Sequence, residues 1–428
     1  MSYNFLNITK GFKKNFINKK FTLLLFGNFF SQILLGLTFI LISKRVDASE
    51  VVDFGRNISF AGVITIFSTL RFELSGFGLN EKFAKKNFSR ALIVSSLLSF
   101  FLIIVSIIYA SFVDNKKFLS LISLCILIFS NSAIAILNKY YLLDSNYRKI
   151  TLLRTFQAII FLFFSFIFLN LKINTITLYF ALAKIISILL IINKKDIIYF
   201  WNGCKLQIQN KSQKTYEKNN IKFLQLFKDN IRNNFSAINK SIASYAPMLF
   251  GSFFIDENTL SCYYILTTTL GNITSSPRSA AKEIISKKLR VIHNSVDLKK
   301  QKIINIIFFY IILTLTISTI IYLNPNIISS IISCKDIKFL ILICILYKSF
   351  ESISYPFSDL LEIWSKSKKL FLINIKLFFL VFVVWPILGN FISFTSSSIL
   401  IIYIGMMSLY WVDLLSLTFK EYSLKNHI

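Results

Sequence analysis

The stretch Asn193–Arg232, NKKDIIYFWNGCKLQIQNKSQKTYEKNNIKFLQLFKDNIR, is the one long polar interval in an otherwise apolar chain. Apolar segments precede and follow it, each with about the 17–25 residues that cross a bilayer as a helix. Within the interval, nine Lys and Arg face three Asp and Glu, an excess that marks the cytoplasmic side of a membrane. The stretch therefore predicts two membrane-embedded halves joined by a cytoplasmic linker.

Composition excludes a water-soluble globular domain. The 428 residues are 55% hydrophobic, and the mean hydropathy is +0.64. The formal net charge is +28, but the basic residues lie between the apolar segments, which is the pattern of membrane topology. We therefore expect membrane lipids as partners, through anionic head groups, and no nucleic acid.

About twelve segments are expected to span the membrane, making an all-α polytopic protein of two six-helix bundles. Predicted cytoplasmic segments hold 34 of the 48 Lys and Arg, and predicted external loops hold 8 when Lys338 at the outer border of its span is included. This difference places both termini in the cytoplasm. The predicted spans are 21–43, 57–78, 91–112, 118–138, 150–169, 173–193, 233–254, 259–280, 303–323, 337–357, 370–389 and 398–418.

The domain plan follows from these spans. The longest predicted external loops are Lys44–Arg56 and Asn324–Asp336, so no space remains outside for a catalytic domain. Six spans per half predict parallel repeats related by a pseudo-twofold axis along the membrane normal. The predicted parts are a cytoplasmic amphipathic lead-in at 1–20, a bundle at 21–193, the basic linker at 194–232, a second bundle at 233–418 and a cytoplasmic tail at 419–428.

Cysteine spacing indicates neither a metal site nor redox chemistry. The chain has five cysteines and no C-x-x-C pair. We expect small apolar free thiols, as is usual for isolated cysteines in apolar segments. A bridge between Cys262 and Cys334, both near the predicted outer face, stands as the alternative.

Two stretches carry a family resemblance. Residues 68–74, STLRFEL, close the second predicted span, and residues 227–288 contain FKDN, a Pro, a Gly, a Tyr-Tyr pair and Ser-Pro. The first is similar to the R-Y-E-L signature of polysaccharide exporters, with Phe72 in place of the usual Tyr. The second is similar to the seventh and eighth helices of the same exporters. With the twelve-span plan, the chain resembles Wzx-type O-antigen and polysaccharide flippases of the multidrug/oligosaccharidyl-lipid/polysaccharide (MOP) superfamily.

The resemblance implies a function and a location. Such flippases move an oligosaccharide linked to undecaprenyl pyrophosphate from the inner to the outer leaflet by alternating access, for surface polysaccharide such as O-antigen or capsule. It implies a bacterial cytoplasmic (inner) membrane, an H+ or Na+ coupling ion, and glycan polymerase or assembly proteins as partners. No cofactor is expected.

Six basic residues within the predicted spans are the candidate substrate-binding groups. A cation at mid-membrane costs about 2.5–3.5 kcal/mol on insertion scales, so such residues normally face a protein interior or a watery cavity. Their excess over intramembrane acids predicts a positive cavity that attracts pyrophosphate and acidic sugars. With Arg278 at the inner mouth, which ordinary positive-inside charge explains equally well, the set is Lys240, Lys184, Arg71, Lys348, Arg154, Arg278 and Lys376.

Each candidate also has a structural interpretation. Arg154 and Lys376 lie near cytoplasmic ends, from which they can snorkel to the interface. Lys348 and Glu351, three residues apart, can pair on one helix face. Asparagines at 28, 131, 239 and 272 either bond sugar hydroxyls or join helices. The candidate coupling or gating acids, each also a potential structural ion-pair partner, are Glu351, Asp359, Asp413 and Glu73.

No enzyme constellation occurs in the sequence. His293 and His427 lack a nearby Cys or carboxylate cluster, and no G-x-x-x-x-G-K-[ST] motif is present. We therefore expect a transporter. Three alternatives are kept: a MATE-like small-molecule exporter, which would favour intramembrane carboxylates; an integral-membrane glycosyltransferase or polymerase using the acids at 47–53; and a non-transporting scaffold of a glycan-assembly complex.

Overall fold

The computed structural model describes most of the first half of the chain and parts of the second. All regular elements among the described residues are helical. The described residues are 19–70, 72, 81–112, 118–170, 175–209, 234–235, 237–269, 271, 319, 341–342, 344–345, 347–348, 351, 367–391 and 396–425.

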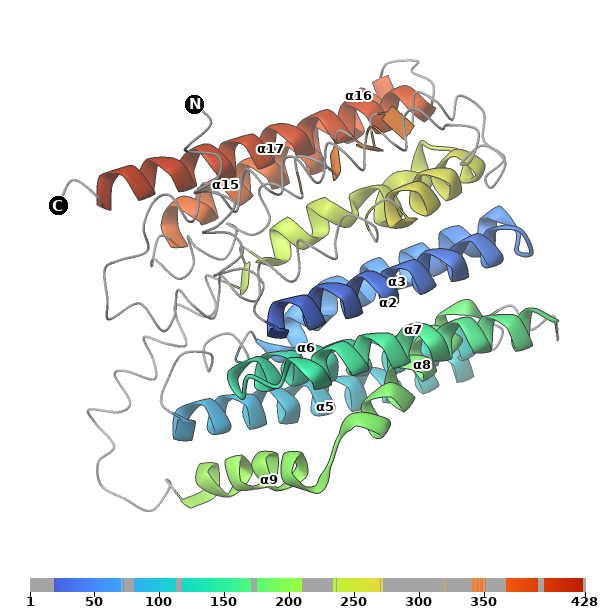
Figure 1. Cartoon of the computed structure of the whole chain (residues 1–428). Helices are drawn as coiled ribbons and strands as arrows, with labels where there is room; N and C mark the ends of the chain where they lie inside the picture. The colour runs from blue at the N-terminus through green and yellow to red at the C-terminus, as the bar shows by residue number, and fades with distance from the viewer. Residues whose placement is uncertain are drawn as a thin grey trace, which may run out of the picture.

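In the described part of the first half, five apolar helices of 22–32 residues are followed by two helices of 16 residues. None of them contains proline, so their backbone groups are satisfied within each helix, as a bilayer interior requires. Helix α2 packs along α7, α5 along α6, and α8 against both α6 and α7 (Figure 1). The helices are α2 (Lys19–Ser43), α3 (Ala48–Thr69), α5 (Glu81–Phe112), α6 (Phe118–Leu143), α7 (Tyr147–Asn170), α8 (Ile176–Ile191) and α9 (Lys194–Gln209).

Helix α3 begins nine residues before the predicted start of the second span. The predicted external loop Lys44–Arg56 is wrong, because only the turn before Ala48 is non-helical. Polar Glu50 and Asp53 suggested a loop, but they share the first two turns with Val51, Val52 and Phe54, which are 1–3% exposed. These turns are amphipathic helix, with the polar residues on one face and the apolar ones packed in the core.

The described part of the second half contains interrupted helices and one continuous helix of 30 residues. Residues 237–250 are helical and end in the 3-10 turn η2 (Gly251–Phe253), and residues 257–269 form another helix. Asp256 caps this helix, since its Oδ1 accepts the Thr259 amide at 2.8 Å. The remaining elements are α15 (Ser367–Phe379), the π-helical turn η4 (Leu380–Val384), α16 (Trp385–Phe391) and α17 (Ser396–Lys425).

The π-helical turn lies close to a proline. Pro386 has no amide hydrogen, so it cannot continue the hydrogen-bond ladder, and a local widening of the helix absorbs the interruption. The turn η4 ends at Val384, two residues before Pro386. The indole of Trp385 donates to Ile399 O at 3.0 Å, which fastens this break to α17.

The described helices have the length and surface of membrane spans. Seven are long and apolar enough to cross a bilayer, and α8 reaches the same length and polarity only together with α9, from which it is bent by 97°. Large apolar side chains face outward, as with Leu97 at 64% and Phe100 at 63% exposure on α5. Such a surface requires an apolar surrounding, so the chain is a multi-span membrane protein.

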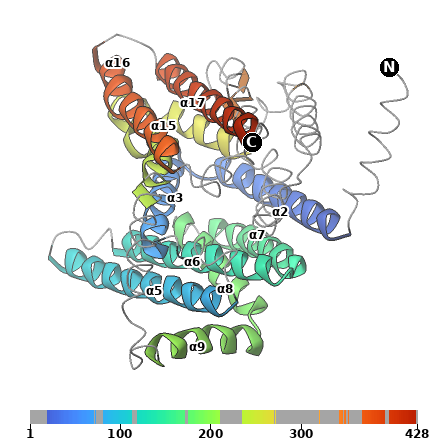
Figure 2. The same ribbon diagram turned by 90° about the vertical axis from the view of Figure 1, so that its left-hand side faces the viewer.

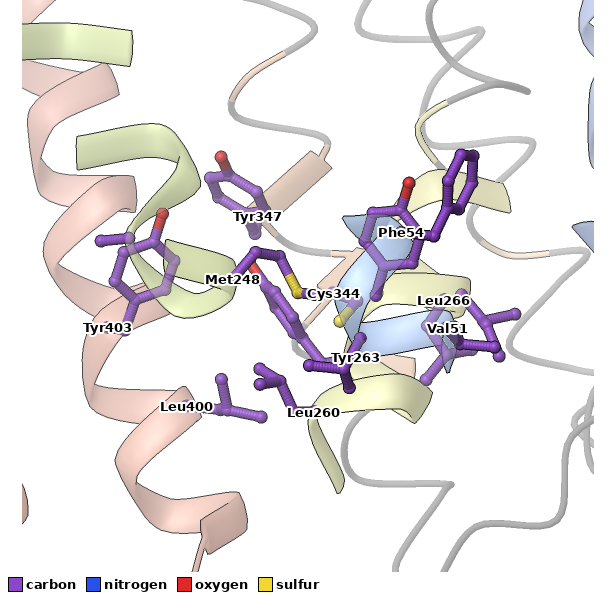
Figure 3. Packing of buried hydrophobic residues seen from close by; sticks show 14 of the residues in the cluster. Val51, Phe54, Met248, Leu260, Tyr263, Leu266, Cys344, Tyr347, Leu400 and Tyr403 are labelled. Atoms are coloured by element: carbon purple, nitrogen blue, oxygen red, sulfur yellow. The ribbon is translucent and has the colours of Figure 1, made fainter. Parts of the chain in front are cut away.

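One buried core joins the two halves. It contains side chains of α2, α3, α6, α7 and α8 together with side chains of residues 243–266, 341–347 and α15–α17. In Figures 1 and 2, α2 and α3 lie between the other first-half helices and the second half. Figure 3 shows Val51 and Phe54 of α3 beside Leu266 and Met248, with Tyr403 of α17 across from them. A second core, which includes Phe88, belongs to the first half alone.

The cysteine expectation holds in part. Cys125, Cys204 and Cys344 are free thiols, as expected. Cys262 is disulfide-bonded, so the expectation of a free thiol is wrong at that position. Its partner lies outside the described residues. Distance in the fold, rather than spacing in the chain, decides whether two thiols can meet.

Candidate functional site

The structure describes seven of the eleven candidate residues. Arg71, Glu73, Arg278 and Asp359 lie outside the described residues.

Lys184 is the most enclosed of the candidate amines. It lies near the middle of α8 and is 8% exposed. Its Nζ donates to Oδ1 of Asn131 on α6 and lies 4.1 Å from the centroid of the Phe180 ring. An amide oxygen and a ring face both attract a cation without neutralising it. The amine is therefore held inside the first bundle by uncharged partners.

Arg154 joins two packed helices. Its Nη1, on α7, donates to Asn28 Oδ1 on α2 at 2.6 Å. Asn28 is 1% exposed, so the amide brings a polar partner into the interface between α2 and α7. Asn28 and Asn131 thus serve the helix-joining role that was one of the two predictions for them, each through a basic side chain.

Lys240 lies against α17. Its Nζ is 4.8 Å from the centroid of the Trp411 indole, and Trp411 is 1% exposed. Indole is the best aromatic partner for an ammonium group. The contact fixes this amine at the junction between helix 237–250 and α17.

Lys348 and Glu351 form the ion pair that was predicted as their structural alternative. The Lys348 Nζ is 2.8 Å from Glu351 Oε2, and both side chains are 14% exposed. The amine also lies 4.9 Å from the Tyr347 ring centroid. The lysine stem passes beside Gly271, where a Cβ would stand in ordinary van der Waals contact, 3.5 Å from its Cε and Nζ.

Tyr403 supplies a hydrogen bond that Pro247 cannot supply within its helix. Proline has no amide hydrogen, so the carbonyl four residues earlier, that of Ala243, loses its helical donor. The Tyr403 hydroxyl donates to Ala243 O at 2.8 Å and lies 3.0 Å from Ser244 O. Tyr403 is 0% exposed. A buried side chain of α17 thus stabilises a bending point in helix 237–250.

Lys376 and Asp413 pair on the surface. Their Nζ and Oδ2 atoms are 2.7 Å apart, with side chains 63% and 42% exposed. The pair joins α15 to α17, so Asp413 has the structural ion-pair partner that was predicted as one alternative. The partners shown for the candidate cations are thus of three kinds: amide oxygens for Lys184 and Arg154, an indole ring for Lys240, and carboxylates for Lys348 and Lys376.

The contact between the halves depends on two glycines that sequence reasoning missed. A Cβ on Gly55 of α3 would lie 2.4 Å from Met248 Cε and 3.0 Å from Tyr264 Cδ2, and one on Gly62 would lie 2.8 Å from Tyr245 Cε2. Glycines seven residues apart share a helix face, which was the signal available in the sequence.

Aromatic and polar contacts extend this junction. The Tyr264 ring centroid is 6.2 Å from those of Phe39 and Phe54. Beside them, the Arg56 guanidinium donates to Ser252 Oγ at 3.2 Å. The first two-thirds of α3, which begin next to Asp47, therefore pack the first half against the second half.

No group of three or more His, Cys, Asp or Glu placed to hold a metal ion occurs among the residues that the structure describes.

Solved structures share this fold over nearly the whole chain. A MATE transporter in complex with MaD5 gives a TM-score of 0.63 at 14% identity, covering 98% of each chain. A multidrug resistance MATE family transporter of the MOP superfamily, in an outward-facing conformation, gives 0.55 at 11% identity, covering 95% of this chain and 96% of the other. A MOP superfamily transporter from Pyrococcus furiosus, whose binding pocket of reverse polarity suggests a different function, gives 0.54 at 12% identity, covering 95% and 96%.

No protein-family model and no curated protein matches the sequence. At these identities the likeness shows the fold alone. The chain has the fold of MOP superfamily transporters, which is the predicted class of two six-helix bundles. The predicted fold class is therefore confirmed.

Proposed function

We propose that this protein is a flippase that moves undecaprenyl-pyrophosphate-linked oligosaccharide from the inner to the outer leaflet of a bacterial cytoplasmic membrane. Its two bundles alternate access to a central path, and both termini lie in the cytoplasm. The product serves surface polysaccharide synthesis, in which glycan polymerase and assembly proteins are the partners. An H+ or Na+ gradient supplies the driving force.

The observation that carries this proposal is Lys184. An amine that is 8% exposed near the middle of a spanning helix is costly, and the partners found for it, Asn131 and Phe180, are uncharged. Its charge is therefore available to an anionic group such as a pyrophosphate. A transporter of cations would instead place an acid at this position, because a lysine would repel a cationic cargo.

The second candidate function is export of small molecules by a MATE-like mechanism. The similarity of fold to MATE transporters favours it. The MOP transporter of reverse pocket polarity supports the view that pocket charge separates functions on this fold. The two proposals thus differ in the sign of the charge that the cargo carries.

Leaflet-resolved labelling of the lipid-linked intermediate tests the choice. Cells with the protein should expose the glycan on the outer leaflet, and Lys184→Ala or Lys240→Ala should leave it on the inner leaflet at equal expression. Gly36→Ala is the matched control, because a Cβ at Gly36 meets nothing within 4 Å. Intact surface glycan with raised drug sensitivity in cells that lack the protein would instead select the exporter.

A further inference from the structure

Helix α9 turns sharply away from the bundle. It leaves α8 at 97° across a short break, and it packs against α5 at one edge of the molecule in both views (Figures 1 and 2). Because α8 packs along the spanning helices α6 and α7, a helix at right angles to α8 runs parallel to the membrane plane.

A buried carboxylate locks this bend. Asp196 is 3% exposed, and its carboxylate accepts hydrogen bonds from Lys149 Nζ at 2.5 Å and from the Tyr141 hydroxyl at 3.0 Å. Asn193 Oδ1 in turn accepts the Asp196 amide at 3.1 Å, which caps the new helix. The direction of α9 is therefore set by the fold of the first half.

The depth of α9 follows from the last turn of α8. Leu189 and Leu190 are 69% and 61% exposed, so the apolar surrounding of α8 reaches the bend. A helix that leaves at this level in the membrane plane runs along the boundary between acyl chains and head groups.

Helix α9 has one buried face and one exposed side. Asp196, Phe200 and Gly203 are buried on one face, where a Cβ on Gly203 would stand 2.5 Å from Lys85 O of α5. The exposed side carries apolar Ile197 at 60%, Ile198 at 47% and Trp201 at 62%.

The same exposed side is also basic. Lys194, Lys195, Asn202 and Lys205 are exposed among the apolar residues. A helix with one face on the protein and an exposed side of apolar and basic residues has the composition of an interfacial helix.

We propose that α9 is a binding surface for anionic phospholipid in the leaflet at which α8 ends. The side chains of Ile197, Ile198 and Trp201 enter the boundary of the acyl chains. The amines of Lys194, Lys195 and Lys205 bind head-group phosphates, with their stems along the apolar boundary. The lipid bound at this site contacts α9, and the site is separate from the candidate cations inside the bundles.

Depth-dependent quenching tests the apolar contact. Full-length protein in phosphatidylglycerol vesicles is compared with Trp201→Phe, and the difference in fluorescence isolates the Trp201 signal. Bromine placed on the acyl chain near the glycerol should quench this signal more strongly than bromine near the chain end. Quenching by aqueous iodide, with none from either brominated lipid, would show a water-facing or protein-binding surface and overturn the proposal.

Lipid selectivity tests the basic contact. The association of spin-labelled phosphatidylglycerol, relative to phosphatidylcholine, is measured for the protein and for a variant with Lys194, Lys195 and Lys205 replaced by Gln. The variant should lose roughly fivefold or more of the selectivity at low salt, while Lys44→Gln, at the far end of α2, should change it little. Unchanged selectivity in the triple variant would contradict the proposal, and normal thermal stability of both variants excludes misfolding.

Discussion

A methyl group on Gly55 should separate the two halves at their contact. In the structure, a Cβ at this position would lie 2.4 Å from Met248 Cε and 3.0 Å from Tyr264 Cδ2, whereas ordinary contacts are 3.4–4 Å. The Met248 methyl is at the end of a flexible side chain and can move. The Tyr264 ring is 7% exposed and packed edge-on against both Phe39 and Phe54, so it cannot move without shifting helices.

The magnitude follows from the cost of overpacking. One extra methyl in a filled core costs about 1–3 kcal/mol. If the halves separate at this contact during transport, that cost falls on the sealed arrangement alone. The ratio of separated to sealed molecules then rises about 5- to 150-fold. The gain in helix propensity from Gly to Ala, about 1 kcal/mol, is common to both arrangements and cancels.

Thiol labelling measures this ratio. A cysteine at Val51, which is 3% exposed in the core shared by the halves, is placed in a background with the three free cysteines replaced by serine. Gly55→Ala should raise its labelling rate by a membrane-impermeant maleimide. Gly36→Ala, which meets nothing within 4 Å, should not. Equal rates for the two variants in folded protein would refute the reasoning.

Three further predictions follow from buried polar groups. Tyr403→Phe leaves the buried carbonyl of Ala243, whose helical donor Pro247 cannot supply, without a hydrogen bond. The variant should lower the free energy of unfolding by about 1–3 kcal/mol, and unchanged unfolding in sodium dodecyl sulfate would contradict this role. Lys184→Met should reduce translocation of the lipid-linked glycan about tenfold or more, with Lys184→Arg retaining more activity; equal rates in a vesicle assay would remove this residue from the site. Burial acts to raise the pKa of Asp196, but hydrogen bonds from Lys149, the Asn193 amide and Tyr141 outweigh it, so the pKa is lowered. The stability that the Asp196 carboxylate contributes is therefore present at neutral pH and is lost as pH falls below about 4 and through the folded-state pKa. Asp196→Asn should remove this part of the pH dependence of unfolding.

Long apolar runs made several helices predictable. The expected spans 21–43 and 150–169 match α2 and α7 within a few residues, since a run of this length and polarity is stable only as a membrane helix. Helix α5 begins ten residues before its expected start, because charged residues suggested a loop. Lys, Arg and Glu are good helix formers, so the helix continues through them into the aqueous boundary.

The partners of the candidate cations were only partly predictable. The pairing of Lys348 with Glu351 follows from a spacing of three on one helix, which is local information. The contact of Lys184 with Asn131 joins residues 53 apart in the chain, and that of Arg154 with Asn28 joins residues 126 apart. No local pattern contains such distances, because they depend on which helices become neighbours.

Hydropathy and charge along the chain were sufficient to establish a helical membrane protein with a basic central interval. Both are one-dimensional properties, since a bilayer selects segments by length and polarity wherever they occur. Only the tertiary structure decided that α9 lies across α8, that Tyr403 serves the helix broken by Pro247, and that Gly55 meets Tyr264. These contacts require the packing of helices from distant parts of the chain, and packing depends on the shapes of surfaces that meet only after folding.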